Sequence, residues 1–168
     1  MFYLLEQPTD EEFQEMDNRY EEMNPSSVKA TVTLLKAGSD LLTGFEQLLK
    51  RYGLSQGRFL ILIVMNRKPD IKTTPSILAR QVGVTKATMT GLIDGLEKSG
   101  LIKRYHHAQD RRKQDLLLTK AGKDLLAKVL PDYWSRIRDL MEDLSESEEM
   151  LLVNLLAKIT NRLSYLTD

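Results

Sequence analysis

Five residues near the middle of the chain carry groups suited to contact with DNA: Thr85, Lys86, Ala87, Thr88 and Thr90. Threonine hydroxyls can hydrogen-bond base edges or phosphates, a lysine ammonium attracts phosphate, and an alanine methyl can meet the methyl of thymine. Thr85 has the side chain of a helix N-cap, and a helix N-terminus also offers backbone amides and a dipole that favour phosphate. The group therefore indicates a major-groove contact. The alternative is a helix that only packs, with its threonines serving as caps.

A second group consists of one acid followed by three cations: Asp110, Arg111, Arg112 and Lys113. It lies in the polar stretch His107–Gln114, which we expect to turn the chain between strands at Leu101–His106 and Leu116–Leu118. Arginine on a slender hairpin can enter an A·T-rich minor groove, and a neighbouring carboxylate can orient the guanidinium through paired hydrogen bonds. The alternative is a solvated charged turn.

Two short helices must position the first group. Thr74 followed by Pro75 predicts a helix start, Gly83 predicts its end, and Thr85 predicts the start of the next helix. The apolar residues of this second helix fall at i, i+3, i+4 and i+7: Met89, Leu92, Ile93 and Leu96. With that face in the core, the opposite side presents Lys86, Ala87, Thr90 and Asp94.

The flanking segments predict further helices. Residues 9–23 have a capping-box start and apolar residues at helical spacing, Asn24–Ser26 breaks this helix, and long helical patterns follow at 28–52, 119–141 and 145–166. Pro131 is expected to kink the helix over 119–141. The outer helices expose apolar stripes that favour burial against a twofold mate, and a monomeric helical bundle is the alternative.

The fold class predicted is therefore mainly α (α+β winged helix). We expect an acidic amphipathic extension at 1–24, an N-terminal dimerisation helix at 25–54, a winged helix-turn-helix DNA-binding lobe at 55–119 and C-terminal dimerisation helices at 120–168. The extension can lie across the dimer arms or shield the basic face as a charge mimic.

The net charge of zero hides a strong segregation along the chain. Residues 1–24 carry one base against eight acids, a net charge of −7. Residues 80–123 carry ten bases against four acids, a net charge of +6. Local charge sets the attraction of phosphate, so a neutral chain can still bind nucleic acid through its middle.

Several classes of function are disfavoured. The chain has no cysteine, and its two histidines, His106 and His107, are neighbours that point to opposite faces of a strand. We therefore expect no enzyme activity, no cofactor and no metal site. The longest apolar run, Phe59–Met65, is far shorter than a membrane span, and the start lacks the pattern of a signal peptide, so we expect a cytoplasmic protein without membrane contact.

Five motifs stand in order over residues 73–122: Thr74-Pro75-Ser76-x-Leu78-Ala79, Val84-Thr85-Lys86-Ala87-Thr88-x-Thr90-Gly91-Leu92-Ile93-Asp94, Leu96-Glu97-x-x-Gly100-Leu101-Ile102, Asp110-Arg111-Arg112 and Leu118-Thr119-x-x-Gly122. Together they resemble the MarR family of bacterial and archaeal regulators, and the flanking helices extend the resemblance over roughly residues 26–166. The resemblance implies a homodimer that regulates transcription, as a repressor, from a pseudo-palindromic site on double-stranded DNA. Where the chain departs from the pattern, Gly95 stands at a position that is basic in many members.

The resemblance also assigns roles to residues. Thr85, Lys86, Ala87, Thr88 and Thr90 would sit in the major groove. Arg112 would be the minor-groove arginine, oriented by Asp110, while Arg111 would meet the DNA backbone.

Members of this family often respond to a small aromatic ligand held between the dimer arms and the DNA-binding lobe. The aromatic candidates for such a cleft are Phe45, Tyr52, Phe59, Tyr133 and Trp134. Aromatics at helical spacing also commonly belong to the core, and a winged-helix module used for protein contacts, without DNA binding, is the alternative function.

Overall fold

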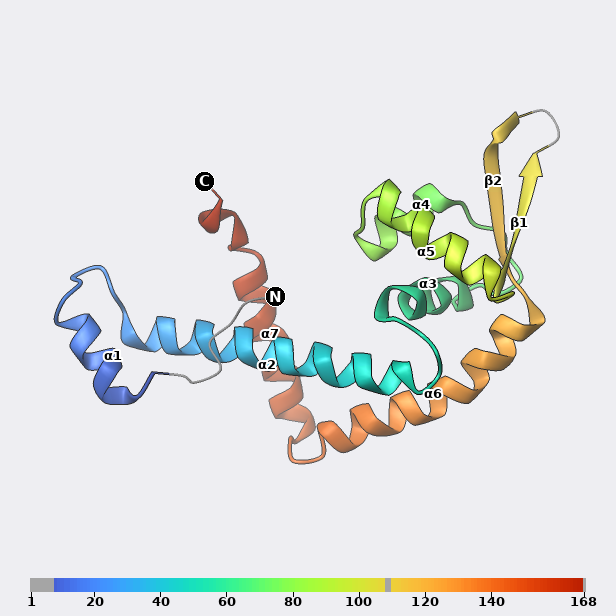
Figure 1. Ribbon diagram of the computed structural model, residues 1–168. Coiled ribbons are helices and arrows are strands. Elements are labelled where there is room, and N and C mark those ends of the chain that lie inside the picture. The colour runs from blue at the N-terminus through green and yellow to red at the C-terminus, as the bar shows by residue number, and fades with distance from the viewer. Residues whose placement is uncertain (1–7, 108–109, 168) are drawn as a thin grey trace. The chain divides into compact units, whose positions relative to one another are not determined.

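The computed structural model describes the backbone of residues 8–107 and 110–167 and the side chains of residues 8–105 and 114–167 (Figure 1). The chain forms two compact units, residues 1–122 and 123–168, which are described separately. In the described part of the chain, none of the helices has both the length and the apolar character that a membrane crossing requires.

The first helix, α1 (Asp10–Asp17), begins with the predicted capping box. The Thr9 hydroxyl accepts from the Glu12 amide at 3.2 Å, and the Glu12 carboxylate accepts from the Thr9 amide at 2.7 Å. The expectation that this helix continues to Met23 is wrong, because the chain turns after Asn18 and leaves Tyr20 60% exposed. Little apolar surface would be buried by extending the helix, so helical spacing alone does not sustain it.

Helix α1 packs on α2 (Pro25–Lys50). Phe13 of α1 is buried, and the ammonium of Lys29 on α2 lies 2.6 Å from the Asp10 carboxylate. Asn24 caps α2 and Pro25 occupies its first turn, where the missing amide hydrogen costs nothing. At 26 residues α2 is about 39 Å long.

Three helices form the centre of the first unit: α3 (Gln56–Asn66), α4 (Pro75–Val82) and α5 (Lys86–Lys98). Thr74 and Thr85 cap α4 and α5 as predicted, and Ser55 caps α3 in the same way, since each accepts a hydrogen bond from a first-turn amide. Gly83 ends α4 in the left-handed conformation, with φ 75°, which allows the tight turn into α5.

The core of this unit comes from these three helices, from the end of α2 and from the hairpin that follows. Its least exposed side chains are Leu49, Ile61, Leu62, Leu78, Met89, Ile93, Leu96, Ile102 and Leu116. The pairing of α4 and α5 is therefore fixed by burial, as the apolar periodicity of both helices predicts.

The hairpin consists of β1 (Ile102–His107) and β2 (Asp110–Leu118), which pair antiparallel. The expectation that His107–Gln114 forms the turn is wrong, because β1 extends through His107 and β2 begins at Asp110. Backbone hydrogen bonds make the ladder, so a polar stretch without hydrophobic alternation can still be strand. The basic run therefore lies in the strand beside the tip.

The second unit contains most of α6 (Lys120–Leu140), all of α7 (Glu146–Thr160) and the short 3-10 helix η1 (Leu163–Leu166). Helix α6 is continuous through Pro131. Helix α7 begins with a capping box in which the hydroxyl and amide of Ser145 both donate to the Glu148 carboxylate, and these bonds lower the pKa of Glu148.

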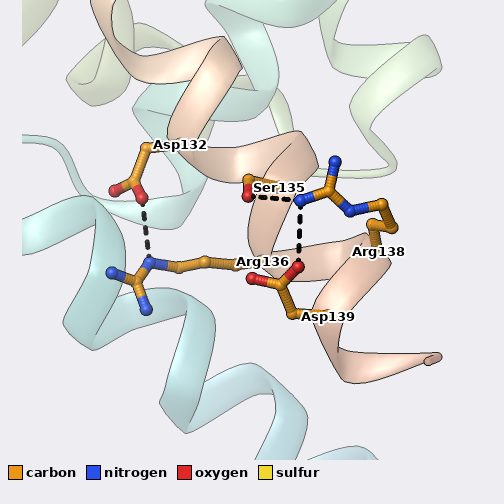
Figure 2. A network of polar contacts seen from close by, with 5 residues as sticks. All are labelled: Asp132, Ser135, Arg136, Arg138 and Asp139. Atoms are coloured by element: carbon orange, nitrogen blue, oxygen red, sulfur yellow. Dashed lines mark hydrogen bonds and ion pairs between the residues drawn. The ribbon is translucent and has the colours of Figure 1, made fainter. Parts of the chain in front are cut away.

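Polar contacts line one stretch of α6 (Figure 2). The Arg136 guanidinium donates to Asp132 at 3.0 Å, and that of Arg138 donates to Ser135 and Asp139, each at 3.1 Å. All of these partners lie within one turn of each other, so the network supports the helix itself.

Candidate nucleic-acid interface

The N-terminal half of α5 presents its polar side chains to solvent. Met89, Ile93 and Leu96 are at most 1% exposed and hold one face of the helix in the core. The five residues from the predicted major-groove group are all exposed: Thr85, Lys86, Ala87, Thr88 and Thr90. The structure therefore brings the whole group together on one accessible end of a rigidly packed helix.

Local hydrogen bonds determine what the threonine hydroxyls can still offer. Thr90 donates its hydroxyl hydrogen to the Lys86 carbonyl at 2.9 Å, so its oxygen faces a ligand as an acceptor. The hydroxyls of Thr85 and Thr88 lie 2.9 Å apart and share one hydrogen bond, which leaves one hydroxyl hydrogen of the pair available. The amide of Thr88 also donates to Thr85 at 3.2 Å.

Arg104 of β1 fastens the hairpin to α5. Its side chain is only 15% exposed; it forms an ion pair with Asp94, and its Nε lies 2.8 Å from a Glu97 carboxylate oxygen without the alignment of a hydrogen bond. Asp94, predicted only as an exposed residue of α5, is therefore a partner of the wing. Arg104 was not among the predicted site residues; the signal for it in the sequence was two acids, at i and i+3 on a helix, followed by a basic strand.

The middle of the hairpin carries a cluster around Tyr105, which pairs with Asp115. The ammonium groups of Lys72 and Lys103 lie 4.7 Å and 5.3 Å from the centre of its ring. Lys72 also lies 3.8 Å from the carboxylate of Asp115, which is paired with Tyr105 in the strand register. In addition, the backbone of Thr73 bonds both ways with Leu116, at 3.0 Å and 2.8 Å. The segment before α4 thus supports the wing.

The predicted minor-groove group occupies β2 next to the tip of the hairpin. The backbone of Asp110, Arg111, Arg112 and Lys113 belongs to this strand. Their side chains fall outside the described residues, so the orientation of Arg112 by Asp110 stays a prediction.

Gly95 of α5 makes room for a cation from another helix. A Cβ atom placed on Gly95 would meet the guanidinium of Arg58, coming within 2.7 Å of its Cζ. Arg58 is half-buried on α3, and a Cβ atom placed on the neighbouring Gly57 would lie 3.1 Å from the Leu92 side chain. The space left by the missing side chain at position 95 is therefore filled by Arg58, a residue that sequence analysis did not single out.

The five aromatic residues proposed for an effector cleft divide between the two units. Phe59 is only 3% exposed in the core of the first unit, where Phe45 and Tyr52 are half-buried. In the second unit the rings of Tyr133 and Trp134 meet edge to face at 5.1 Å, and burial raises the pKa of Tyr133. Phe59 is thus a core residue, and a cleft shared by both units stays a prediction.

Comparison with known proteins identifies the family. The model of the MarR family matches residues 54–113, which run from the start of α3 into the wing. The transcriptional repressor YetL of Bacillus subtilis is 35% identical over 149 residues, covering 89% of each chain. The chain belongs to the MarR family. It is accordingly a transcriptional regulator with a winged helix-turn-helix fold.

Solved structures of MarR-type proteins share this fold. Sco3205 of Streptomyces coelicolor, a MarR family regulator solved in complex with DNA, superposes with a TM-score of 0.76 at 19% identity, covering 84% of this chain and 89% of its own. BpsR of Bordetella bronchiseptica, whose DNA binding is regulated by 6-hydroxynicotinic acid, superposes with a TM-score of 0.68 at 22% identity. The match covers 79% of this chain and 98% of the BpsR chain. The predicted fold class is confirmed.

Proposed function

We propose that this MarR-family regulator represses transcription by binding a pseudo-palindromic operator on double-stranded DNA as a homodimer. The observation that carries the proposal is the exposed, hydroxyl-rich end of α5, held in the core by Met89, Ile93 and Leu96. In this proposal Lys86 binds phosphate, Ala87 and the threonines meet bases, and Arg112 enters the minor groove. Such a regulator works where the DNA is, in the cytoplasm.

The dimer is proposed from the terminal helices. Every residue of α7 is at least partly exposed, including large apolar ones such as Leu151, Leu155 and Ile159 at 56%, 47% and 49%. Contiguous apolar surface of this kind marks an interface, and a twofold mate would bury it. In functional terms residues 25–54 and 120–168 would then be dimerisation elements around a DNA-binding lobe at 55–119.

The N-terminal extension at 1–24 is proposed to brace the dimer arm. Burial of Phe13 and the pair between Asp10 and Lys29 support this role, because they attach α1 to α2. Deleting residues 1–24 distinguishes this bracing role from the alternative, in which the acidic extension shields the basic face as a charge mimic. Loss of dimer stability supports bracing, and tighter DNA binding at low salt supports mimicry.

A small aromatic effector is proposed to release the protein from DNA. The support is the resemblance to BpsR together with the half-buried rings of Phe45, Tyr52 and Tyr133. Such a ligand acts only through its different affinities for the DNA-bound and free states.

A salt titration tests DNA binding against the alternative of a protein-interaction module. Duplex affinity, measured by fluorescence anisotropy, should fall by about 0.9 log units per phosphate contact for each tenfold rise in salt. Arg112→Ala should weaken binding and reduce the preference for A·T-rich flanks. Weak, salt-insensitive affinity for every duplex would favour the alternative, and an unchanged Arg112→Ala variant would refute the wing assignment.

A further inference from the structure

A hollow of about 310 Å³ lies in the first unit, where the end of α3, the segment 67–73 and α4 meet. Met65 and Leu78 line it and are buried, while Ile71 and Ile77 line it and remain 61% and 39% exposed. The hollow thus leaves apolar surface open to solvent, and its volume falls in the range of small-molecule sites.

The charged residues that line the hollow are all cations: Arg67, Lys68 and Lys72. Within the described residues no ion pair joins Arg67 or Lys68 to a carboxylate, and Lys72 stays 3.8 Å from that of Asp115. Asp70, the one acid of the segment, does not line the hollow. Cations beside an apolar wall complement an anion that has an apolar body.

The hollow is connected to the wing. Lys72 lines it and also contacts the Tyr105 ring of β1, while Thr73 lines it and bonds to the backbone of β2 through Leu116. A ligand that draws the Lys72 ammonium away from Asp115 would weaken the support at the middle of the wing.

We propose that this hollow binds amphipathic organic anions, aryl or alkyl carboxylates and sulfonates. None of the aromatic residues assigned to the effector cleft lines it, so it is a second, separate site. Binding here does not depend on the proposed operator function. Its consequence for DNA affinity, through Lys72 and Thr73, does rest on that function.

Fluorescence titration of the full chain with 1-anilinonaphthalene-8-sulfonate tests the site, with the neutral N-phenyl-1-naphthylamine as the matched probe. The double variant Arg67→Glu/Lys68→Glu should bind the anionic probe about tenfold more weakly, and Arg67→Gln/Lys68→Gln should lie between. The control Arg80→Glu/Lys98→Glu, which reverses two exposed cations outside the hollow, should bind as the wild type does. The neutral probe should bind more weakly and respond to none of the variants.

Equal affinity of the anionic probe for the Arg67/Lys68 variants and the control, with unchanged circular dichroism, would overturn the site. So would a loss of duplex affinity and salt dependence in those variants without a change in probe binding, because the cations would then be contacts to DNA phosphate. If the site holds, saturating probe should change duplex affinity in the wild type and not in the Arg67→Glu/Lys68→Glu variant. An unchanged affinity would overturn the coupling to the wing, and absence of any duplex binding would count against the proposed function instead.

Discussion

Lys86 and Thr88 lie close together on α5 and offer different chemistry to DNA. Lys86→Ala should reduce the salt dependence of binding by about one phosphate contact and weaken all duplexes alike. Thr88→Ala should change base preference more than salt dependence, because it removes a hydroxyl without removing charge. The Thr88 amide still donates to Thr85 in this variant, so the helix cap is retained.

The control for this pair is Thr88→Ser, which keeps the hydroxyl and should retain the base preference. Binding measured over a panel of duplexes at several salt concentrations separates the two roles. Identical responses of Lys86→Ala and Thr88→Ala would contradict the assignment.

Arg104 positions the wing without an assigned contact to DNA. Arg104→Ala leaves Asp94 and Glu97 without their partner in the C-terminal half of α5. We expect a loss of about 1 kcal/mol in stability, since both acids are substantially exposed, and a weaker duplex affinity from added repulsion.

Rescue distinguishes positioning from simple destabilisation. In the triple variant Arg104→Ala/Asp94→Asn/Glu97→Gln the repulsion is gone, so duplex affinity at low salt should recover part of the loss. Wild-type affinity of Arg104→Ala would contradict the role of this contact.

At the scale of elements, replacing two different glycines by alanine should change the free energy of unfolding in opposite directions. Gly91 on α5 is exposed and a Cβ there meets nothing within 4 Å, so Gly91→Ala should stabilise the free protein by about 1 kcal/mol. A Cβ on Gly122 would collide with the backbone carbonyl of Leu101, which cannot move like a flexible side chain. Gly122→Ala should destabilise by about 1–3 kcal/mol.

Thermal or urea unfolding measures both variants under the same conditions. A stabilised Gly122→Ala protein would show that the close approach of Gly122 to the Leu101 carbonyl does not matter for folding.

The helix boundaries could be predicted because their signals are local. Thr74, Gly83 and Thr85 each act through hydrogen bonds or backbone angles within one turn, so the residue type alone indicates the position. The length of the hairpin could not be predicted in this way. Strand pairing at Asp110–Gln114 depends on the partner strand, and this polar stretch shows no apolar alternation in the sequence.

The exposed group on α5 followed from periodicity, whereas the contacts of Arg104 and Arg58 did not. The Arg104 guanidinium contacts Asp94, and that of Arg58 lies beside Gly95, so each comes from another element to α5. Contacts of this kind depend on tertiary packing. The absence of a side chain at position 95 was visible in the sequence, but the cation that takes its place was not.

At the scale of the whole molecule, the exposed face of α7 should hold the dimer. Leu155→Arg/Ile159→Arg places two charges in the proposed interface and should convert a dimer into a monomer at micromolar concentration, as measured by sedimentation. Helical content should remain, and affinity for a full operator should fall because only one half-site is held at a time. A wild-type chain that sediments as a single monomer would contradict the dimer.

Selection of bound sequences from random duplex DNA tests the central claim most directly, because it reports DNA binding, half-site arrangement and sequence together. A twofold dimer with one α5 in each of two successive major grooves should enrich inverted half-sites with centres about 10 base pairs apart and A·T-rich flanks. Absence of enrichment, or enrichment of a single unrepeated site, would contradict the account.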